Sequence, residues 1–168
     1  MNKKIGLFWL RDDFRVARND GLIEATRNHN QVVVFYLYKE ELFKLQEAQK
    51  WWISKSLLSF RKQLSSFNIN LKIIKANSFK TFFDNLVKKK DFSIYWNKVY
   101  EPDYLKFDEY LINILKNKNI NHKRFKGNSL NENDEIKKSD GTPFKVFTPF
   151  WRNAEKYYIE KIPPLEKK

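Results

Sequence analysis

Two arginines and two aspartates stand close together near the start of the chain, in the run Arg11-Asp12-Asp13-Phe14-Arg15. A guanidinium group presents a planar fork of N–H donors that can hold a carboxylate or a phosphate through two parallel hydrogen bonds, which an ammonium group cannot do. This run could therefore bind an anionic group of a ligand. The same charges could also pair with one another and hold the loop in place, and the charge pattern alone slightly favours this second interpretation.

Other kinds of catalytic or metal-binding chemistry find few residues to use. The chain has no Cys, so disulfides, thiolate metal sites and Cys nucleophiles are excluded, and a reducing cytoplasm fits the composition. His29 and His122 each stand beside an Asn in an expected turn, where we expect them to be solvated. Gly6 and Gly21 do not form a glycine-rich phosphate fingerprint. We therefore expect no metal site, no catalytic residue and no ordinary dinucleotide binding.

Short apolar runs that are long enough for strands alternate with helical patterns along most of the chain. Strands are predicted over residues 5–10, 31–38, 70–75, 92–96 and 121–126. Helices are predicted over 21–28 with Asp20 as its cap, over 40–67, after a capping Ser78, and over 104–118. This alternation of strands and helices predicts an α/β fold with a parallel sheet, in which the helical crossovers are right-handed. The expected architecture is a three-layer, Rossmann-like, open parallel five-stranded sheet with helices on both faces.

The helix expected over residues 40–67 has its apolar residues at three- and four-residue spacing, so they form one inner face. That predicted face consists of Trp52, Ile53, Ser56, Leu57, Phe60, Leu64 and Phe67.

The carboxyl ends of the predicted strands are where a ligand would bind, at the point where the strand order reverses. Residues 11–19, 38–41 and 97–103 follow the first, second and fourth strands and so meet at that edge. Most tryptophans at helical or strand positions fill a core. Trp96, which ends a strand, is the one that we expect to line the cleft.

Length and charge limit the remaining possibilities. A chain of 168 residues suits one domain, and we divide it into a core over residues 1–127 and an extension over 128–168 that leads toward an interdomain linker. In that extension, residues 142–149 are predicted to be extended and 150–159 helical. No apolar run approaches the ~20 residues of a membrane span, so we expect a cytoplasmic protein without membrane contact. The net charge of +13 invites nucleic acid, but the lysines are scattered apart from the run 88–90, and we expect contact with DNA only indirectly.

Three separated stretches together resemble the photolyase and cryptochrome family, in the right order. Residues 7–15, followed by Asn19 and Leu22, resemble the family's opening motif. Residues 95–102 resemble its fourth-strand motif, and residues 141–151, GTPFKVFTPFW, are similar to the segment that closes its first domain. The three stretches span nearly the whole chain.

This resemblance implies an antenna domain, which in full-length members holds a light-harvesting pigment against a larger helical domain. Family members use a folate, a deazaflavin or FMN as the pigment and pass its excitation to FAD in the helical domain. The FAD then reduces a pyrimidine dimer in DNA photolyases, which are carbon–carbon lyases, or signals in cryptochromes. We do not expect FAD to bind this chain alone, and we do not expect the chain alone to repair DNA, because no second cofactor fold is visible in the sequence.

A bound pigment should therefore lie among residues near the three strand ends. We expect Arg11 to steady an anionic group and the aromatic rings to stack on the chromophore. The candidate residues are Arg11, Asp12, Asp13, Leu37, Tyr38, Trp52, Lys55, Trp96, Asn97 and Glu101.

Two alternatives stay open at this point. The chain could be an interaction module that binds no pigment and docks on a separate FAD-binding helical partner, or it could be a signalling fragment of the cryptochrome type. A lone antenna domain should expose the surface that faces its neighbour, and it could self-associate through that surface. The residues expected there are Phe144, Phe147, Phe150 and Trp151.

Overall fold

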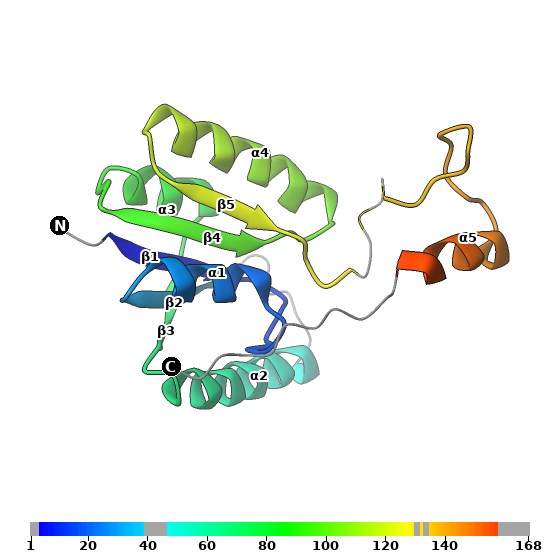
Figure 1. The fold of residues 1–168 in the computed structure, drawn as a ribbon. Helices are drawn as coiled ribbons and strands as arrows, with labels where there is room; N and C mark the ends of the chain where they lie inside the picture. The colour runs from blue at the N-terminus through cyan, green and yellow to red at the C-terminus, as the bar shows by residue number, and fades with distance from the viewer. Residues whose placement is uncertain (1–3, 39–46, 130–131, 133–134, 158–168) are drawn as a thin grey trace. The chain divides into compact units, whose positions relative to one another are not determined.

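The computed structural model describes residues 4–38, 47–129, 132 and 135–157 of the chain. It divides into two compact units, Met1–Asn128 and Ser129–Lys168, which we describe separately. The first unit alternates strands and helices as the sequence predicts (Figure 1). Its elements are β1 (Ile5–Leu10), α1 (Asp20–Asn28), β2 (Val32–Tyr38), α2 (Glu47–Ser65), β3 (Asn70–Lys75), α3 (Phe79–Leu86), β4 (Phe92–Asn97), α4 (Pro102–Asn117) and β5 (His122–Phe125).

The described strands form one five-stranded parallel sheet in the order β3-β2-β1-β4-β5. Strand β1 is hydrogen-bonded to β2 on one side, with Leu10 opposite Tyr36, and to β4 on the other, with Trp9 opposite Trp96. The chain therefore builds outward from β1 in one direction and then returns to continue from β4 in the other. The predicted fold class is confirmed, and the reversal of strand order lies between β1 and β4.

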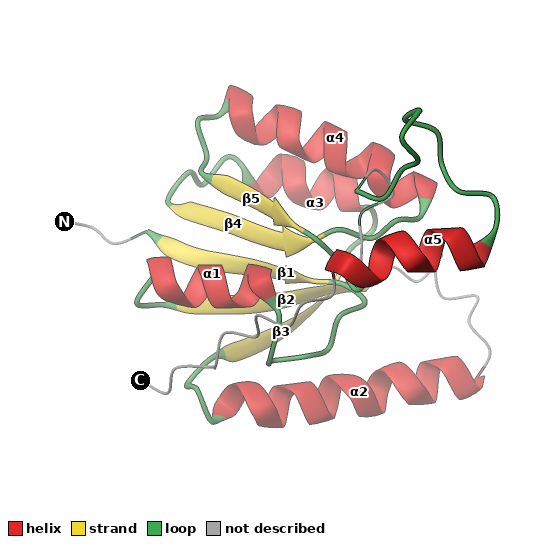
Figure 2. Ribbon diagram, turned by 45° about the vertical axis from the view of Figure 1, so that its right-hand side comes forward, coloured by secondary structure: helices red, strands yellow, loops and turns green. Residues whose placement is uncertain are grey.

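Helices cover both faces of this sheet, which makes three layers (Figure 2). Successive strand residues point to opposite faces. Phe8 and Leu10 accordingly pack with residues of α1 and α2, whereas Trp9 packs with residues of α3 and α4. All six residues of β4 are buried, as expected for a strand covered on both sides.

Local hydrogen bonds and residue types determine where three of the helices begin. The side chain of Asn19 accepts a hydrogen bond from the backbone N–H of Leu22, so Asn19 caps α1 and the predicted cap at Asp20 is wrong by one residue. Ser78 accepts from the N–H of Thr81 and caps α3 as predicted. Helix α4 begins with Pro102, whose missing N–H would have no partner in a first turn anyway.

Helix α2 buries a narrower face than its sequence predicts. Leu57, Phe60 and Leu64 are its buried residues. Trp52 is 67% exposed, because it lies five residues before Leu57 and thus about 140° around the helix from it. Phe67 lies beyond the end of the helix and is 42% exposed. The first part of the predicted helix, residues 40–46, lies outside the described residues.

The second unit contains one helix, α5 (Phe147–Ala154), and a 3-10 turn (Glu155–Tyr157) among its described residues. The prediction of an extended segment through residue 149 is wrong, because the helix begins at Phe147. Pro149 stands in its first turn, where its ring and missing N–H are tolerated. The rings of Phe147 and Trp151, one turn apart, stack with centroids 6.2 Å apart and planes 13° apart. Residues 158 and 159, also predicted as helix, lie outside the described residues.

None of the described helices in either unit is both long and apolar enough to cross a membrane.

Candidate functional site

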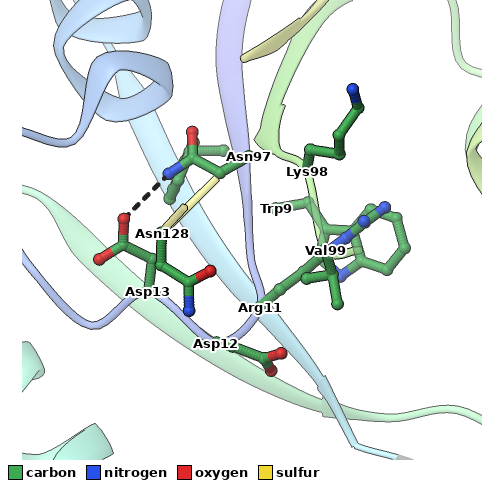
Figure 3. Close-up of a pocket in the computed structure, with 9 residues that line it drawn as sticks. Trp9, Arg11, Asp12, Asp13, Asn97, Lys98, Val99 and Asn128 are labelled. Atoms are coloured by element: carbon green, nitrogen blue, oxygen red, sulfur yellow. Dashed lines mark hydrogen bonds between the residues drawn. The ribbon is translucent and has the colours of Figure 1, made fainter. Parts of the chain in front are cut away.

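A small pocket opens at the carboxyl ends of β1 and β4, where the strand order reverses (Figure 3). Its volume of about 10 Å³ is close to that of a single water site. The side chains that line it come from the two strand ends and the loops that follow them. They include Arg11, Asp12, Asp13, Asn97, Lys98 and Val99.

A buried network of side-chain amides ties the two strand ends to α1. The Nδ2 atom of Asn97 donates to Oδ1 of Asn19 at 2.9 Å and to Oδ2 of Asp13 at 3.4 Å, the second bond being drawn in Figure 3. The Nδ2 atom of Asn19 donates in turn to the carbonyl oxygen of Arg15 at 2.9 Å. Since Asn19 also caps α1, this one buried side chain joins the loop, the helix and β4.

The charges of the first loop do pair internally at Asp13 and Arg15. The guanidinium of Arg15 donates through Nε at 2.7 Å and through Nη2 at 2.8 Å to the two carboxylate oxygens of Asp13. This hydrogen-bonded carboxylate raises the pKa of Arg15. Asp13 therefore stabilises the loop, and both of its carboxylate oxygens already accept hydrogen bonds from Arg15 where it lines the pocket.

Arg11 is buried and paired with a carboxylate of α4. Its two terminal nitrogens donate to the two carboxylate oxygens of Asp108 in α4, which is fully buried. The guanidinium also lies over the ring of Trp9, with its central carbon 3.9 Å from the ring centroid. Burial lowers the pKa of Arg11, while the hydrogen bond and charge of Asp108 oppose that shift. The pairing occupies the fork that the sequence analysis assigned to an anionic ligand group.

The mouth of the pocket is acidic. Asp12 and Glu101 are both exposed there. The pKa of Asp12 is raised, first because neighbouring protein displaces water from its carboxylate and second because of the negative charge of Glu101. Burial raises the pKa of Tyr104, and the charge of Asp12 adds to it. Burial likewise raises the pKa of Tyr36 to about 12. The phenols of Tyr36 and Tyr104 are therefore un-ionised at neutral pH.

Two of the predicted site residues belong to the core and do not reach the pocket. Trp96 is 0% exposed and stacks on the ring of His122, so the expectation that it lines the cleft is wrong. Its side chain points to the same face as Trp9, toward α3 and α4, and the next residue, Asn97, points to the pocket instead. Leu37 is buried in the same core cluster.

Four further predicted residues lie outside the pocket lining. Tyr38 is the last residue of β2 and is half-buried. Trp52 and Lys55 are exposed on α2. Glu101 acts on the pocket through its charge on Asp12 and is not among the residues that line it.

Asp108 and Tyr104 belong to the site but are not among the residues predicted for it. Asp108 could have been found, because it is a carboxylate in an otherwise apolar stripe of α4 that includes Leu111 and Leu115. The histidines were expected to be solvated, and both are half-buried instead: His29 bonds the carbonyl of Lys4 at 2.7 Å, and His122 stacks on Trp96.

Within the described part of the chain, three buried polar side-chain atoms have no hydrogen-bond partner: Nε of Arg11, Oδ1 of Asn97 and Nε1 of Trp96. The first two belong to residues that line the pocket. The residues that the structure describes contain no group of three or more His, Asp or Glu side chains that could hold a metal ion.

Comparisons with known proteins agree with this architecture. The family model of DNA photolyase matches residues 6–167. Cryptochrome-2 of Arabidopsis thaliana is 28% identical over 165 residues, covering 96% of this chain and 27% of that protein. A class III photolyase from Agrobacterium tumefaciens has a similar structure, with a TM-score of 0.81, 25% identity, and coverage of 91% of this chain and 32% of that one.

A third similar structure is an archaeal photolyase from Sulfolobus tokodaii with two FAD molecules, which imply a novel light-harvesting cofactor in that protein. Its TM-score is 0.72 at 20% identity, with coverage of 90% of this chain and 35% of that one, so it supports the fold alone. The chain spans between 27% and 35% of the length of these three proteins.

Proposed function

The chain belongs to the DNA photolyase family, matching its N-terminal α/β domain, and we propose that it serves as an antenna domain that binds a light-harvesting chromophore. The observation that carries this proposal is the position of the pocket. It lies at the reversal of strand order, where open parallel sheets bind their ligands, and two of its lining residues have buried polar atoms without partners.

The chemistry of the site suits one edge of a planar heteroaromatic pigment. Asp12 and Glu101 offer exposed acceptor oxygens beside the pocket. The rings of folates, deazaflavins and flavins all carry N–H or amino donors that such acceptors can bind. Tyr104 adds an aromatic ring beside Asp12. The acceptor set therefore fits this class of pigment without favouring one member.

The size of the pocket limits how much of a pigment it could enclose. Pockets for ligands of this size measure roughly 300–1,000 Å³, and this one measures about 10 Å³. The described residues would therefore hold the polar edge of the ring, and its faces would need further cover. Residues 39–46, which join β2 to α2, lie outside the described residues.

A bound antenna pigment would absorb light and transfer its excitation to FAD held by a separate domain or partner chain. The whole activity, light-driven repair of pyrimidine dimers, is proposed only for this chain together with such an FAD-binding partner. Within that scheme the chain's own residues bind and orient the pigment. DNA would then be contacted by the assembly, and no residue of this chain is assigned to the repair chemistry.

Pigment uptake by the purified chain tests the proposal. The chain is incubated separately with a methenyl-folate, FMN and a deazaflavin, freed of unbound pigment, and scanned for absorbance. We expect one of the three to be retained, and the double variant Asp12→Asn/Glu101→Gln to bind it about tenfold or more weakly, because two charge-assisted acceptors are weakened. The matched control is Asp103→Asn/Glu109→Gln on α4. Retention of none of the pigments would exclude the antenna role for this chain.

The small pocket also favours a second function, that of a pigment-free module that docks on a helical flavoprotein. The second unit supports it with apolar residues that are exposed in and next to α5, namely Val146, Phe147 and Trp151. Co-sedimentation with an FAD-binding helical domain, in the dark and under blue light, measures this directly. Loss of the complex in Phe147→Ser/Trp151→Ser supports docking, and a light-dependent complex supports the signalling variant.

A further inference from the structure

Lysines gather at the amino edge of the sheet, opposite the pocket. Lys4 precedes β1, Lys88, Lys89 and Lys90 join α3 to β4, and Lys116 and Lys118 end α4 before β5. We call these six residues, all exposed, the lysine edge. Strands β1, β4 and β5 are neighbours in the sheet, so the starts of these strands lie side by side.

Backbone hydrogen bonds show how close these segments are. The N–H of Ile5, just after Lys4, donates to the carbonyl of Asp91 at 3.4 Å, and Asp91 directly follows Lys90. The N–H of Ile94 in β4 donates to the carbonyl of Asn121 at 2.9 Å. Since neighbouring strands are about 4.8 Å apart, the lysine edge extends across roughly 10 Å of sheet from β1 to β5.

The positive charge of the lysine edge is largely uncompensated. Within the described part of the chain, Lys4, Lys89, Lys90, Lys116 and Lys118 form no salt bridge. Asp91 is the one carboxylate in the four connections at this edge, residues 28–31, 66–69, 87–91 and 118–121. Lys88 donates to the neutral amide oxygen of Asn85 at 2.9 Å.

Helix C-termini attract cations, and this effect accounts for lysines in the last turn of α4. It does not account for the backbone at Lys90, whose φ of 56° lies in the left-handed region that favours Gly or Asn. The equivalent turns before β3 and β5 have Asn68 and Asn119 in that conformation, with φ of 57° and 55°. At the turn before β4 the chain thus has a third consecutive lysine in a position that a non-glycine residue adopts at a cost in stability.

We propose that the lysine edge binds the phosphate backbone of nucleic acid, independently of base sequence and of DNA damage. An ammonium group is a hydrated point charge without the fork that holds one small anion in a fixed geometry. A row of such groups on an exposed edge suits a polymer of regularly spaced phosphates, where each contact releases counterions. The site lies on the opposite edge from the pocket, so it does not depend on the antenna role.

Binding is measured by fluorescence anisotropy with a labelled, undamaged DNA duplex of random sequence, between about 50 and 200 mM salt. The test variant is Lys88→Gln/Lys89→Gln/Lys90→Gln. Its charge-matched control is Lys50→Gln/Lys55→Gln/Lys106→Gln, three exposed lysines of α2 and α4 outside the lysine edge. We expect the test variant to bind about tenfold or more weakly at the lower salt, and its salt slope to fall by about one unit for each phosphate contact removed.

Further measurements in the same assay separate this proposal from its competitors. Circular dichroism checks that both variants are folded, and a second variant, Lys116→Gln/Lys118→Gln, should also weaken binding. A duplex with one pyrimidine dimer should bind as tightly as the undamaged one. Test and control variants that bind alike would overturn the proposal. So would a clear preference for the dimer, or binding to phosphatidylserine vesicles with none to DNA, since the latter would assign the surface to a membrane.

Discussion

At the carboxyl edge of the sheet the Arg11–Asp108 pair is buried, whereas at the amino edge the lysines are exposed and have no carboxylate partner among the described residues. Arg11 and Asp108 are both buried and joined by two hydrogen bonds. Lys89 and Lys90 are exposed and form no salt bridge within the described residues. The Arg11–Asp108 pair thus stabilises the fold, because burying an unpaired ion is costly. The lysines at the other edge remain available to a ligand.

This difference predicts where a mutation costs stability. At the carboxyl edge, removing one partner should leave the other buried and unpaired. At the amino edge, removing a lysine should change stability little, since surface substitutions are usually within about 0.5 kcal/mol. Three substitutions test the contrast, from the largest expected effect to the smallest.

Asp108→Asn should have the largest effect. It removes the charge that faces Arg11 and also receives Arg124 at 3.4 Å, so a buried guanidinium loses its counter-ion. Breaking one side of a buried pair costs about 3–5 kcal/mol, and we expect the free energy of unfolding in urea to fall by that order. Glu109→Gln, on the exposed side of the same helix, is the control and should cost less than about 0.5 kcal/mol. A loss below about 1 kcal/mol for Asp108→Asn would show that the Arg11 pair does not stabilise the edge.

Asn19→Ala should have an intermediate effect. The substitution removes the cap of α1 and leaves the donors of Asn97 and Leu22 short of an acceptor. Losing an N-cap costs about 1 kcal/mol, and an unsatisfied buried donor adds about 1–3 kcal/mol, so the expected loss is about 2–4 kcal/mol by urea unfolding. The matched control is Asn28→Ala, which removes an exposed hydrogen bond from the side-chain amide of Asn28 to the carbonyl oxygen of Glu24. Equal losses for the two variants would contradict the role of the buried amide network.

Lys90→Gly should have the smallest effect, and with the opposite sign. Glycine adopts the φ of 56° without the clash that a side chain meets there, while it adds backbone entropy to the unfolded chain. We expect a gain of about 0.5 kcal/mol in the free energy of unfolding, together with weaker binding to DNA. Lys89→Gly, one residue earlier, is the control and should not stabilise. A stability loss for Lys90→Gly would remove the evidence that this lysine is retained at a cost.

Much of the architecture followed from local patterns. The runs Ile5–Leu10 and Asn70–Lys75 are strands with the predicted bounds, and Ser78 is the predicted cap. These features depend on residue types and periodicity over a few positions, which a sequence displays directly. The errors at Asp20 and before Phe147 are of one to three residues, because capping and the tolerance of Pro149 depend on the hydrogen bonds that the folded loop makes.

The position of the candidate site could be predicted from the sequence better than the side chains that line it. The edge where the loops after β1 and β4 meet follows from the parallel α/β pattern, and Asp12, Asp13 and Asn97 do line the pocket. Trp96 was assigned to the pocket because it stands at the carboxyl end of a predicted strand, next to Asn97. A strand turns neighbouring side chains to opposite faces, so only one of the two could reach it.

The amino-acid sequence by itself determined the alternation of strands and helices, the parallel sheet and the edge at which a ligand would bind, since each follows from short-range periodicity. Only the tertiary structure decided which charges are satisfied. Arg11 and Asp108 are 97 positions apart, and no local pattern shows that they meet. Pairing between buried ions depends on distance and solvent exclusion in space. For that reason the charges of Arg11 and Asp108 are paired and buried at one edge of the sheet, while the lysines form an open, positively charged surface at the other.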